Sequence, residues 1–371
     1  MKDWKNAPCD GASRFENQFS QPLKTHRVFN NPQVLTQGWY PTLKSSALKP
    51  GTACSHKILN QRLVLYRGQD GTVRSMDAFC PHMGADLGNG TVIDNRLRCY
   101  FHHWEFNGDG SNAHVPTLST RCDVRQQAYP VEEKYGFIWV FAGSTATHPV
   151  PVAPGLESTG ADAFYLEEIT LFVHHHILMA NGIDLNHFAT VHHLTVAFNF
   201  EVTEKNSEYV WEMEGKLPHQ GLKARLARWL LGDTFRYRVK ISGGSVATIT
   251  YGYRQQFRGF GRPLPSLHLL WGATPQPSGI SKVKLFLLTQ KRRGVWGKVV
   301  NLCLYGLTLV LLTTIQDEDI KAFPNMRFTT GHLVKADESI ARFVQCLNQL
   351  PLSNWTGGGW HESHIEPRSN V

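Results

Sequence analysis

The sequence predicts an α+β protein in which a small all-β unit precedes a larger α+β unit. Three observations predict this order: short strand-like runs separated by turn dipeptides at about 38–143, a proline-rich stretch at 148–154, and helical and strand-like patterns beyond it. We therefore expect an N-terminal lead at 1–30, a β domain at 31–147 and an α+β domain at 148–371.

The first unit is marked by strands and tight turns. Residues 63–66 and 137–141 predict strands, and Asp70-Gly71 and Asp109-Gly110 are dipeptides of hairpin turns. The polar N-terminus has no apolar stretch of the signal-peptide type. The seven cysteines do not have the spacing of a secreted disulfide framework. We therefore expect a reducing compartment, most simply the cytoplasm.

The second unit is expected to contain several helices and strands in a sheet that curls around a helix and a cavity. Helices are expected at about 179–193, 299–315 and 337–347, and strands at 209–213, 235–241, 246–253 and 283–289. The run 299–315 is strongly apolar but shorter than the roughly 20 residues of a spanning helix. We expect a buried core helix there. The alternative is a peripheral membrane contact, which the basic stretch at 291–298 favours.

Two Cys-His pairs lie in the β unit. Cys80 and His82 form the first pair, and Cys99 and His102 form the second, on neighbouring hairpin-like loops. Two thiolates and two imidazoles are the ligands of a Rieske [2Fe–2S] centre, in which histidines replace two cysteines. A zinc finger uses the same residue types, but it supplies two cysteines and then two histidines. The alternating order found here favours the cluster.

A second motif at 181–192 contains Asn181, Asp184, His187 and His192. Residues three apart share a helix face, so the first three form a polar stripe in an apolar segment. His192 would lie about 140° from His187 on a regular helix, so both reach one metal only if the helix ends or bulges between them. Two histidines and one carboxylate with open positions form the site of non-haem Fe(II) oxygenases. We therefore predict a mononuclear iron site here.

The carboxylate ligand of that iron is expected far along the chain, in the acidic cluster that follows the apolar run. Asp317 and Asp319 are two residues apart, about 200° around a helix, so at most one of them faces the metal. Position alone leaves both open. The remaining histidines near the motif are expected to be bystanders, namely His174, His175, His176 and His193.

With both motifs, the chain resembles the α-subunits of Rieske non-haem iron oxygenases. Within that family it resembles the branch of 3-ketosteroid 9α-hydroxylase oxygenase components and cholesterol 7-desaturases. The resemblance runs from about residue 38 to the final helix and rests on segments at 38–51, 77–88, 181–192 and 318–328. It implies a Rieske domain followed by a helix-grip (START-like) catalytic domain, with one [2Fe–2S] cluster and one mononuclear Fe²⁺ per chain.

The resemblance also implies roles for single residues. Asp184 matches a carboxylate that bridges a cluster histidine across a subunit interface and an iron-ligating histidine, and Asn181 is grouped with it as catalytic. The closing pattern of the family assigns Asp319 rather than Asp317 as the third iron ligand. The residues that match only in that register are Glu318, Ile320, Phe323, Asn325 and Phe328.

Two positions depart from the family. Tyr100 stands where proline is usual, and His103 stands where glycine is usual. If that glycine has a positive φ, His103 carries backbone strain. His103 is also an alternative to His102 as a cluster ligand.

The partners follow from the resemblance and from the charge. The family implies a homotrimer, O₂, and electrons from a separate NAD(P)H-dependent reductase, often through a ferredoxin. A separate reductase also agrees with the lack of a GxGxxG nucleotide fingerprint in the sequence. The net charge of +8 is spread over scattered Lys and Arg, which favours an acidic electron carrier over nucleic acid.

The predicted function is hydroxylation, oxidative demethylation or desaturation of a large apolar substrate of steroid or sterol type. One alternative is a dioxygenase or demethylase acting on an aromatic acid, whose carboxylate would need Arg236, Arg238 or Lys240 in the cavity. The other alternative is a non-enzymatic Rieske electron carrier, against which the extra residues 150–371 argue.

Overall fold

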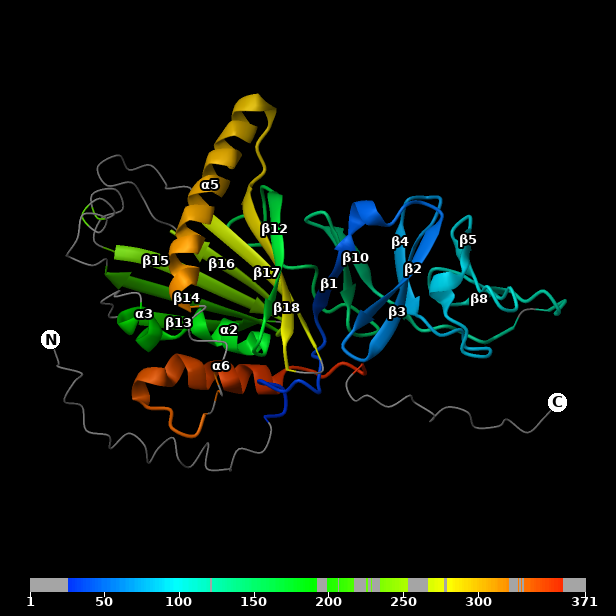
Figure 1. Ribbon diagram of the computed structural model, residues 1–371, viewed down its shortest axis with the longest axis horizontal. Helices are drawn as coiled ribbons and strands as arrows, with labels where there is room; N and C mark the ends of the chain where they lie inside the picture. Colours follow the sequence, from blue (N-terminus) through cyan, green and yellow to red (C-terminus); the bar gives the residue numbers. More distant parts are fainter. Residues whose placement is uncertain are drawn as a thin grey trace.

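A computed structural model shows two β-rich parts side by side, with small sheets on the right and one large sheet with its helices on the left (Figure 1). The structure describes residues 26–120, 122–191, 199–205, 207–216, 225, 228, 234–252, 266–276, 279–319, 326, 328 and 330–355. All strand pairs among these residues are antiparallel.

The N-terminal part contains three small sheets. The first has the order β1 (Trp39–Lys44), β11 (Phe137–Phe141), β10 (Val131–Lys134). The second has the order β2 (Thr52–Ile58), β3 (Gln61–Arg67), β4 (Val73–Asp77), β9 (Ala128–Tyr129). The third has the order β5 (Thr91–Ile93), β6 (Arg96–Arg98), β7 (Glu105–Phe106), β8 (Asn112–His114). Two short 3₁₀ helices, η3 (Ser45–Ala47) and η4 (Leu87–Asn89), complete this part.

The expected strands and turns of this part are confirmed. Residues 63–66 and 137–141 lie in β3 and β11, and the two predicted turns join β3 to β4 and β7 to β8. Gly110 has a φ of 81°, and a Cβ there would lie 1.9 Å from the carbonyl oxygen of Gln126. Only glycine fits this turn, because the backbone is left-handed and a neighbouring strand approaches closely.

The C-terminal part is built on a seven-stranded sheet. Its order is β12 (Ala161–Leu171), β18 (Ser281–Gln290), β17 (Leu267–Pro275), β16 (Val246–Tyr251), β15 (Thr234–Ser242), β14 (Glu208–Lys216), β13 (Asn199–Lys205). The strands expected from the sequence are confirmed as β14, β15, β16 and β18. The other three, β12, β13 and β17, were not expected from the sequence.

One face of this sheet carries the largest hydrophobic core. A continuous apolar row crosses five neighbouring strands through Trp211, Val239, Ile249, Leu269 and Leu287. Helices α2 (His175–Asn181) and α6 (Glu338–Gln349) cover this face with their own apolar side chains. The helix expected at 337–347 is therefore confirmed as α6, which follows a 3₁₀ turn, η6 (Lys335–Asp337). Burial of each large apolar side chain in this core contributes about 1.5–3 kcal/mol.

The opposite face of the large sheet packs against the first small sheet. Trp139 and Phe286 lie 6.0 Å apart between ring centroids, and both are fully buried. The proline-rich stretch expected as a linker is packed into this interface, where Val150 and Ala153 are buried and the indole N–H of Trp39 donates to the carbonyl of His148 at 2.7 Å. The two parts therefore share an apolar interface.

The single helix expected at about 179–193 is wrong. The chain forms α2, which ends at Asn181, and a separate helix α3 (Leu185–Thr190). Between them Asp184 is extended, and its carboxylate accepts a hydrogen bond from the backbone N–H of His187 at 3.0 Å. Aspartate favours the N-cap position of a helix over an interior position. This preference explains why α2 ends before Asp184 and α3 begins after it.

The expectation of a buried core helix at 299–315 is also wrong for the side chains described. Helix α5 (Gly294–Asp319) contacts β17 and β18, yet most of its apolar side chains up to Leu309 are exposed. The buried positions on this stretch are the polar Asn301 and Thr308. No helix among the described residues has both the length and the apolarity needed to cross a bilayer.

Candidate metal centres

Two loops of the N-terminal part bring the predicted cluster residues together, and both loops have the same hydrogen-bond pattern. In the first, Cys80 N–H donates to the carbonyl of Ala85 at 2.8 Å, and Gly84 N–H donates back to the carbonyl of Cys80 at 2.8 Å. In the second, Cys99 N–H donates to Trp104 and His103 N–H donates back to Cys99, at 2.8 and 3.1 Å. Each loop thus turns tightly around one cysteine.

The fifth residue of each loop has a left-handed backbone. Gly84 has a φ of 74° and His103 has a φ of 57°. The strain expected at His103 if the usual glycine has a positive φ is therefore present, since His103 occupies the position equivalent to Gly84. A non-glycine residue in this conformation costs roughly 1–2 kcal/mol.

The two cysteines are buried and free of disulfide bonds. They lie in one hydrophobic core with Val64, Tyr66 and Phe106. Burial, together with the neighbouring Cys99 thiol, raises the pKa of the Cys80 thiol to about 12. Hydrogen bonds from the backbone N–H groups of His82 and Met83 act in the opposite direction and lower this pKa. Thiolates at this position therefore need a compensating positive charge, which metal ions supply.

The two histidines lie at the solvent-exposed end of the same loops. The ring centroids of His82 and His102 are 4.6 Å apart, and His82 stacks on Trp104 at 4.5 Å with nearly parallel planes. Two buried thiols beneath two adjacent exposed imidazoles fit the donor set of a [2Fe–2S] centre with mixed ligands. Trp104, which the sequence interpretation did not single out, orients one imidazole. Its only sequence signal is its place two residues after His102.

A half-buried carboxylate, Asp86, holds the first loop. Asp86 accepts hydrogen bonds from the Ser55 hydroxyl at 2.6 Å and the Gly88 N–H at 2.8 Å, and it pairs with Arg62. A Cβ at Gly88 would lie 2.0 Å from the Ser55 Oγ, so this close approach requires glycine. The loop that carries Cys80 is therefore positioned by β2 and β3.

The second predicted centre lies around α2 and α3. Asn181 ends α2, Asp184 caps α3, and His187 lies in the first turns of α3, so the three residues do not form a stripe on one continuous helix. Helix α3 ends at Thr190. A helix end before residue 192 is what the sequence required for the two histidines to reach one metal.

The carboxyl group of Asp184 is held in place by its neighbours. Burial raises its pKa, the His187 backbone N–H opposes the rise, and Asp337 adds to it. Asp337 in turn accepts from the Asn186 amide at 2.6 Å. The Asn186–Asp337 hydrogen bond joins α3 to η6, and the hydrogen bond from the His187 N–H orients the Asp184 carboxylate.

The other two predicted iron ligands are His192 and Asp319. His192, like the bystander His193, lies outside the described residues. Asp319 is the last residue of α5, but its side chain and that of Asp317 also lie outside them. The assignment of the third ligand therefore stays a prediction.

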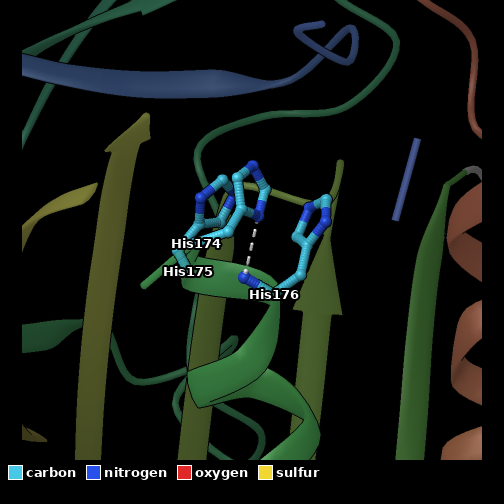
Figure 2. Close-up of side chains that lie close together, drawn as sticks. All are labelled: His174, His175 and His176. Atoms are coloured by element: carbon cyan, nitrogen blue, oxygen red, sulfur yellow. Dashed lines mark hydrogen bonds between the residues drawn. The ribbon is translucent and has the colours of Figure 1, made fainter. Parts of the chain in front are cut away.

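A different histidine cluster is the one group in the described part of the chain with three potential metal-ligating atoms within 4.8 Å of one another. It consists of the buried residues His174, His175 and His176 at the start of α2 (Figure 2). The His174 Nδ1 accepts from the His176 N–H at 3.3 Å, which caps the helix. The bystander expectation can be tested against the hydrogen bonds of these rings.

The hydrogen bonds favour a structural role for this cluster. The His176 Nδ1 accepts from the Asn30 N–H at 3.0 Å, and the Nε2 atoms of His175 and His176 each lie 3.1 Å from the carbonyl of Gly244. A carbonyl only accepts, so both Nε2 atoms carry hydrogens and offer no lone pair. Burial lowers the pKa of all three histidines, to about 3 for His175.

Comparison with known proteins agrees with the cluster loops. Residues 38–130 match the family model of the Rieske [2Fe-2S] domain. Cholesterol 7-desaturase nvd of Drosophila melanogaster is 26% identical over 379 residues, which covers 95% of this chain and 84% of that protein. The 3-chlorobenzoate-3,4-dioxygenase oxygenase subunit of Comamonas testosteroni is 31% identical over 166 residues, 43% of this chain and 38% of that protein.

Among solved structures, dicamba monooxygenase bound to dicamba shares the fold, with a TM-score of 0.54 at 19% identity over 87% of this chain and 98% of the other. The alignment with the fly desaturase spans most of both proteins, whereas the chain spans about two fifths of the dioxygenase subunit. The similarity to oxygenases thus continues beyond the Rieske domain, which argues against a simple electron carrier. The chain carries a Rieske [2Fe–2S] domain and is a homologue of the Rieske non-haem iron oxygenases.

Proposed function

We propose that this chain is the oxygenase component of a Rieske system that hydroxylates, desaturates or oxidatively demethylates a large apolar substrate of steroid or sterol type. Rieske oxygenases carry a [2Fe–2S] cluster and a mononuclear iron, and they use O₂ and electrons from a reductase or ferredoxin. The alignment over 95% of the chain with a protein named cholesterol 7-desaturase supports the substrate class.

The observation that carries the proposal is the direction of the basic residues on β15. Arg236, Arg238 and Lys240 are the candidates for binding a substrate carboxylate. They alternate along the strand with Tyr237 and Val239, which belong to the core on the helix-covered face, so they lie on the opposite face of the sheet. Each is paired with an acidic residue of β14, and the ion pairs are Arg236–Glu214, Arg238–Glu212 and Lys240–Glu208.

The side chains next to α3 are aromatic instead. Phe188 lies 5.6 Å from Tyr237 between ring centroids, and Tyr237 lies 5.3 Å from Tyr251. These rings stand between the helix that carries His187 and the sheet. Such surroundings favour an apolar substrate over an anionic one, because none of the three β15 cations turns toward them.

We also propose how the residues divide the work. The domains are the lead at 1–30, the Rieske domain at 31–147 and the catalytic domain at 148–371. The cluster would be held by Cys80, His82, Cys99 and His102, and the iron by His187, His192 and Asp319. When bound, these groups supply electrons and O₂ activation. Asp184 orients the imidazole of an iron ligand, and its fixed carboxylate suits a contact to a cluster histidine of a neighbouring subunit in a homotrimer.

The test is turnover by the purified protein, loaded with cluster and iron, with a generic ferredoxin and reductase. The panel contains steroids, sterols and benzoate-like acids, and mass spectrometry measures product against O₂ consumed. We expect coupled product from the apolar compounds. Coupled product from benzoate-like acids alone would refute the proposal.

A variant of Arg236 tests the aromatic-acid alternative in the same assay. Arg236→Gln removes an exposed ion pair worth at most about 1 kcal/mol, so we expect KM and kcat to stay unchanged. A selective rise in KM for an acidic substrate in this variant would instead support the aromatic-acid alternative.

A further inference from the structure

Helix α5 has an inverted distribution of polar and apolar side chains. Its residues Asn301, Tyr305 and Thr308 share one face by their spacing, and Asn301 and Thr308 are 4% and 2% exposed against the sheet. The Asn301 amide donates to the Asp162 carboxylate at 2.9 Å, and the Thr289 hydroxyl donates to the Tyr305 hydroxyl at 3.2 Å. The polar face of this helix is therefore directed inward.

The outward face of the same helix is apolar. Trp296 is 82% exposed, Val295 is 77% exposed and Leu302 is 67% exposed. Phe164 of β12, 5.5 Å from Tyr305 between ring centroids, extends the surface. We call this the α5 surface, and its exposed members are Phe164, Val295, Trp296, Val299, Val300, Leu302, Leu307 and Leu309. A helix on a water-exposed surface has the opposite arrangement, so the α5 surface is suited to an apolar environment.

Basic residues surround the beginning of this surface. Lys291, Arg293 and Lys298 are exposed there, and Arg292 donates to the Asn301 side chain at 2.5 Å. In Figure 1 the first turns of α5 project beyond the ends of the strands of the large sheet. The most exposed apolar residues and the cations thus lie together on a projecting element.

We propose that the α5 surface docks the protein on an anionic lipid bilayer, with Trp296, Val295 and Leu302 in the interface and the cations against the headgroups. Tryptophan and lysine next to exposed aliphatic side chains are the combination found in interfacial helices. A second copy that packed through the same surface would place its own cations against these cations, which disfavours a dimer built on the α5 surface. The inference rests on the α5 surface alone and holds whatever the substrate is.

Vesicle sedimentation of the full-length protein tests the proposal. We expect binding to vesicles of phosphatidylcholine mixed with phosphatidylglycerol, and weaker binding to phosphatidylcholine alone. Trp296→Asp combined with Leu302→Asp should lower the partition coefficient about tenfold or more. Lys291→Gln and Lys298→Gln should each lower it about fivefold, and this loss should shrink at high salt.

The matched control is Leu118→Asp combined with Val124→Asp, which places the same two charges on exposed apolar residues of the Rieske domain and should bind as the parent does. Visible absorption of the Rieske cluster reports that each variant is folded. Tryptophan quenching by brominated lipids provides a second readout, since Trp296→Phe should bind vesicles but lose part of the quenching seen in the parent.

Three results would overturn the proposal. The parent protein does not sediment with anionic vesicles at low salt, or the double aspartate variant sediments as the parent does, or quenching is unchanged in Trp296→Phe. A parent that is a larger assembly in lipid-free light scattering, reduced in size by the double aspartate variant, would show that a second copy covers the surface instead.

Discussion

At the scale of single residues, the cluster loops show how backbone conformation limits sequence. The two loops are equivalent, with Gly84 and His103 at corresponding left-handed positions. No atom lies within 4 Å of a Cβ built on Gly84, so a side chain there would meet conformational strain but no clash. Substitutions at Gly84 and His103 therefore test the cost of a left-handed backbone separately from side-chain packing.

We predict that His103→Gly raises the free energy of unfolding by about 1 kcal/mol, because it relieves the left-handed strain. Gly84→Ala should lower it by a similar amount. Thermal unfolding of the cluster-loaded protein measures both. The Rieske absorption should persist in His103→Gly and be lost in His102→Ala, and the reverse pattern would make His103 the ligand.

A second prediction at this scale concerns Asp184. Asp184→Asn keeps a side-chain oxygen that caps α3, so both metal centres should stay occupied. Turnover should nevertheless be nearly abolished, because the amide cannot replace a carboxylate between two imidazoles. Iron content and steady-state rate are the measurements. A normal rate would limit Asp184 to its capping role.

At the scale of elements, the beginning of α2 depends on neutral histidines. His174 accepts the capping hydrogen bond, and its Nε2 is buried with no hydrogen-bond partner among the described residues. The His176 Nδ1 accepts from the Asn30 N–H. A proton added to the Nδ1 atom of His174 or His176 would therefore point at the N–H group that this atom now accepts from. The start of the helix is therefore sensitive to acid.

The sign of this effect follows from the lowered pKa values. A histidine whose folded pKa lies below 6.5 binds protons more readily when unfolded, so stability is complete above about pH 6.5 and falls as the pH drops below it. His174→Asn keeps a capping oxygen and removes one such ring. We expect a smaller loss of urea resistance between neutral and acidic pH in this variant. An unchanged pH dependence would contradict the prediction.

The end of α5 carries the next prediction. Asp319→Ala should lower the iron content from about three to about two per chain, while the Rieske absorption and EPR signals persist. Asp317→Ala is the matched control and should retain about three. Loss of iron in the control but not in Asp319→Ala would move the ligand to Asp317.

At the scale of the whole molecule, the two proposed centres lie on different parts that share an apolar interface through Trp139 and Phe286. His82 and His102, the exposed histidines predicted as cluster ligands, are bordered by the exposed side chains of Met83, Tyr100 and Phe101. An apolar rim around an exposed redox centre is suited to contact with another protein. This arrangement agrees with electron transfer between subunits.

Mixing two inactive variants tests that transfer. Cys99→Ser should lack the cluster, and His187→Ala should lack the mononuclear iron. Neither should turn over alone. Subunits exchanged by mild unfolding and refolding, or co-expressed, should regain part of the parent activity, because in the proposed homotrimer every mixed assembly pairs an intact cluster with an intact iron site. If no activity returns in mixed trimers that mass analysis confirms, transfer within one chain is the better explanation.

Residues close together in the chain were enough to predict the cluster loops and most local structure. The Cys-His spacings predicted the cluster loops, and alternation predicted four strands of the large sheet, because both depend on residues close in the chain. The strain at His103 was expected only if the glycine usual in the family has a positive φ, and the φ of 57° at His103 meets that condition. The break between α2 and α3 was missed because the capping preference of Asp184 competes with helical periodicity over the same few residues.

Which faces of the elements are buried follows from contacts between distant segments and not from the local pattern. The periodicity of α5 is apolar on most sides, so its sequence could not show that Asn301 and Thr308 turn inward while Trp296 turns outward. Likewise, alternation along β15 separates Arg238 from Val239 but does not say which of the two sides the helices cover. Local sequence sets the elements and their two faces, whereas contacts between residues far apart in the chain select the face that packs.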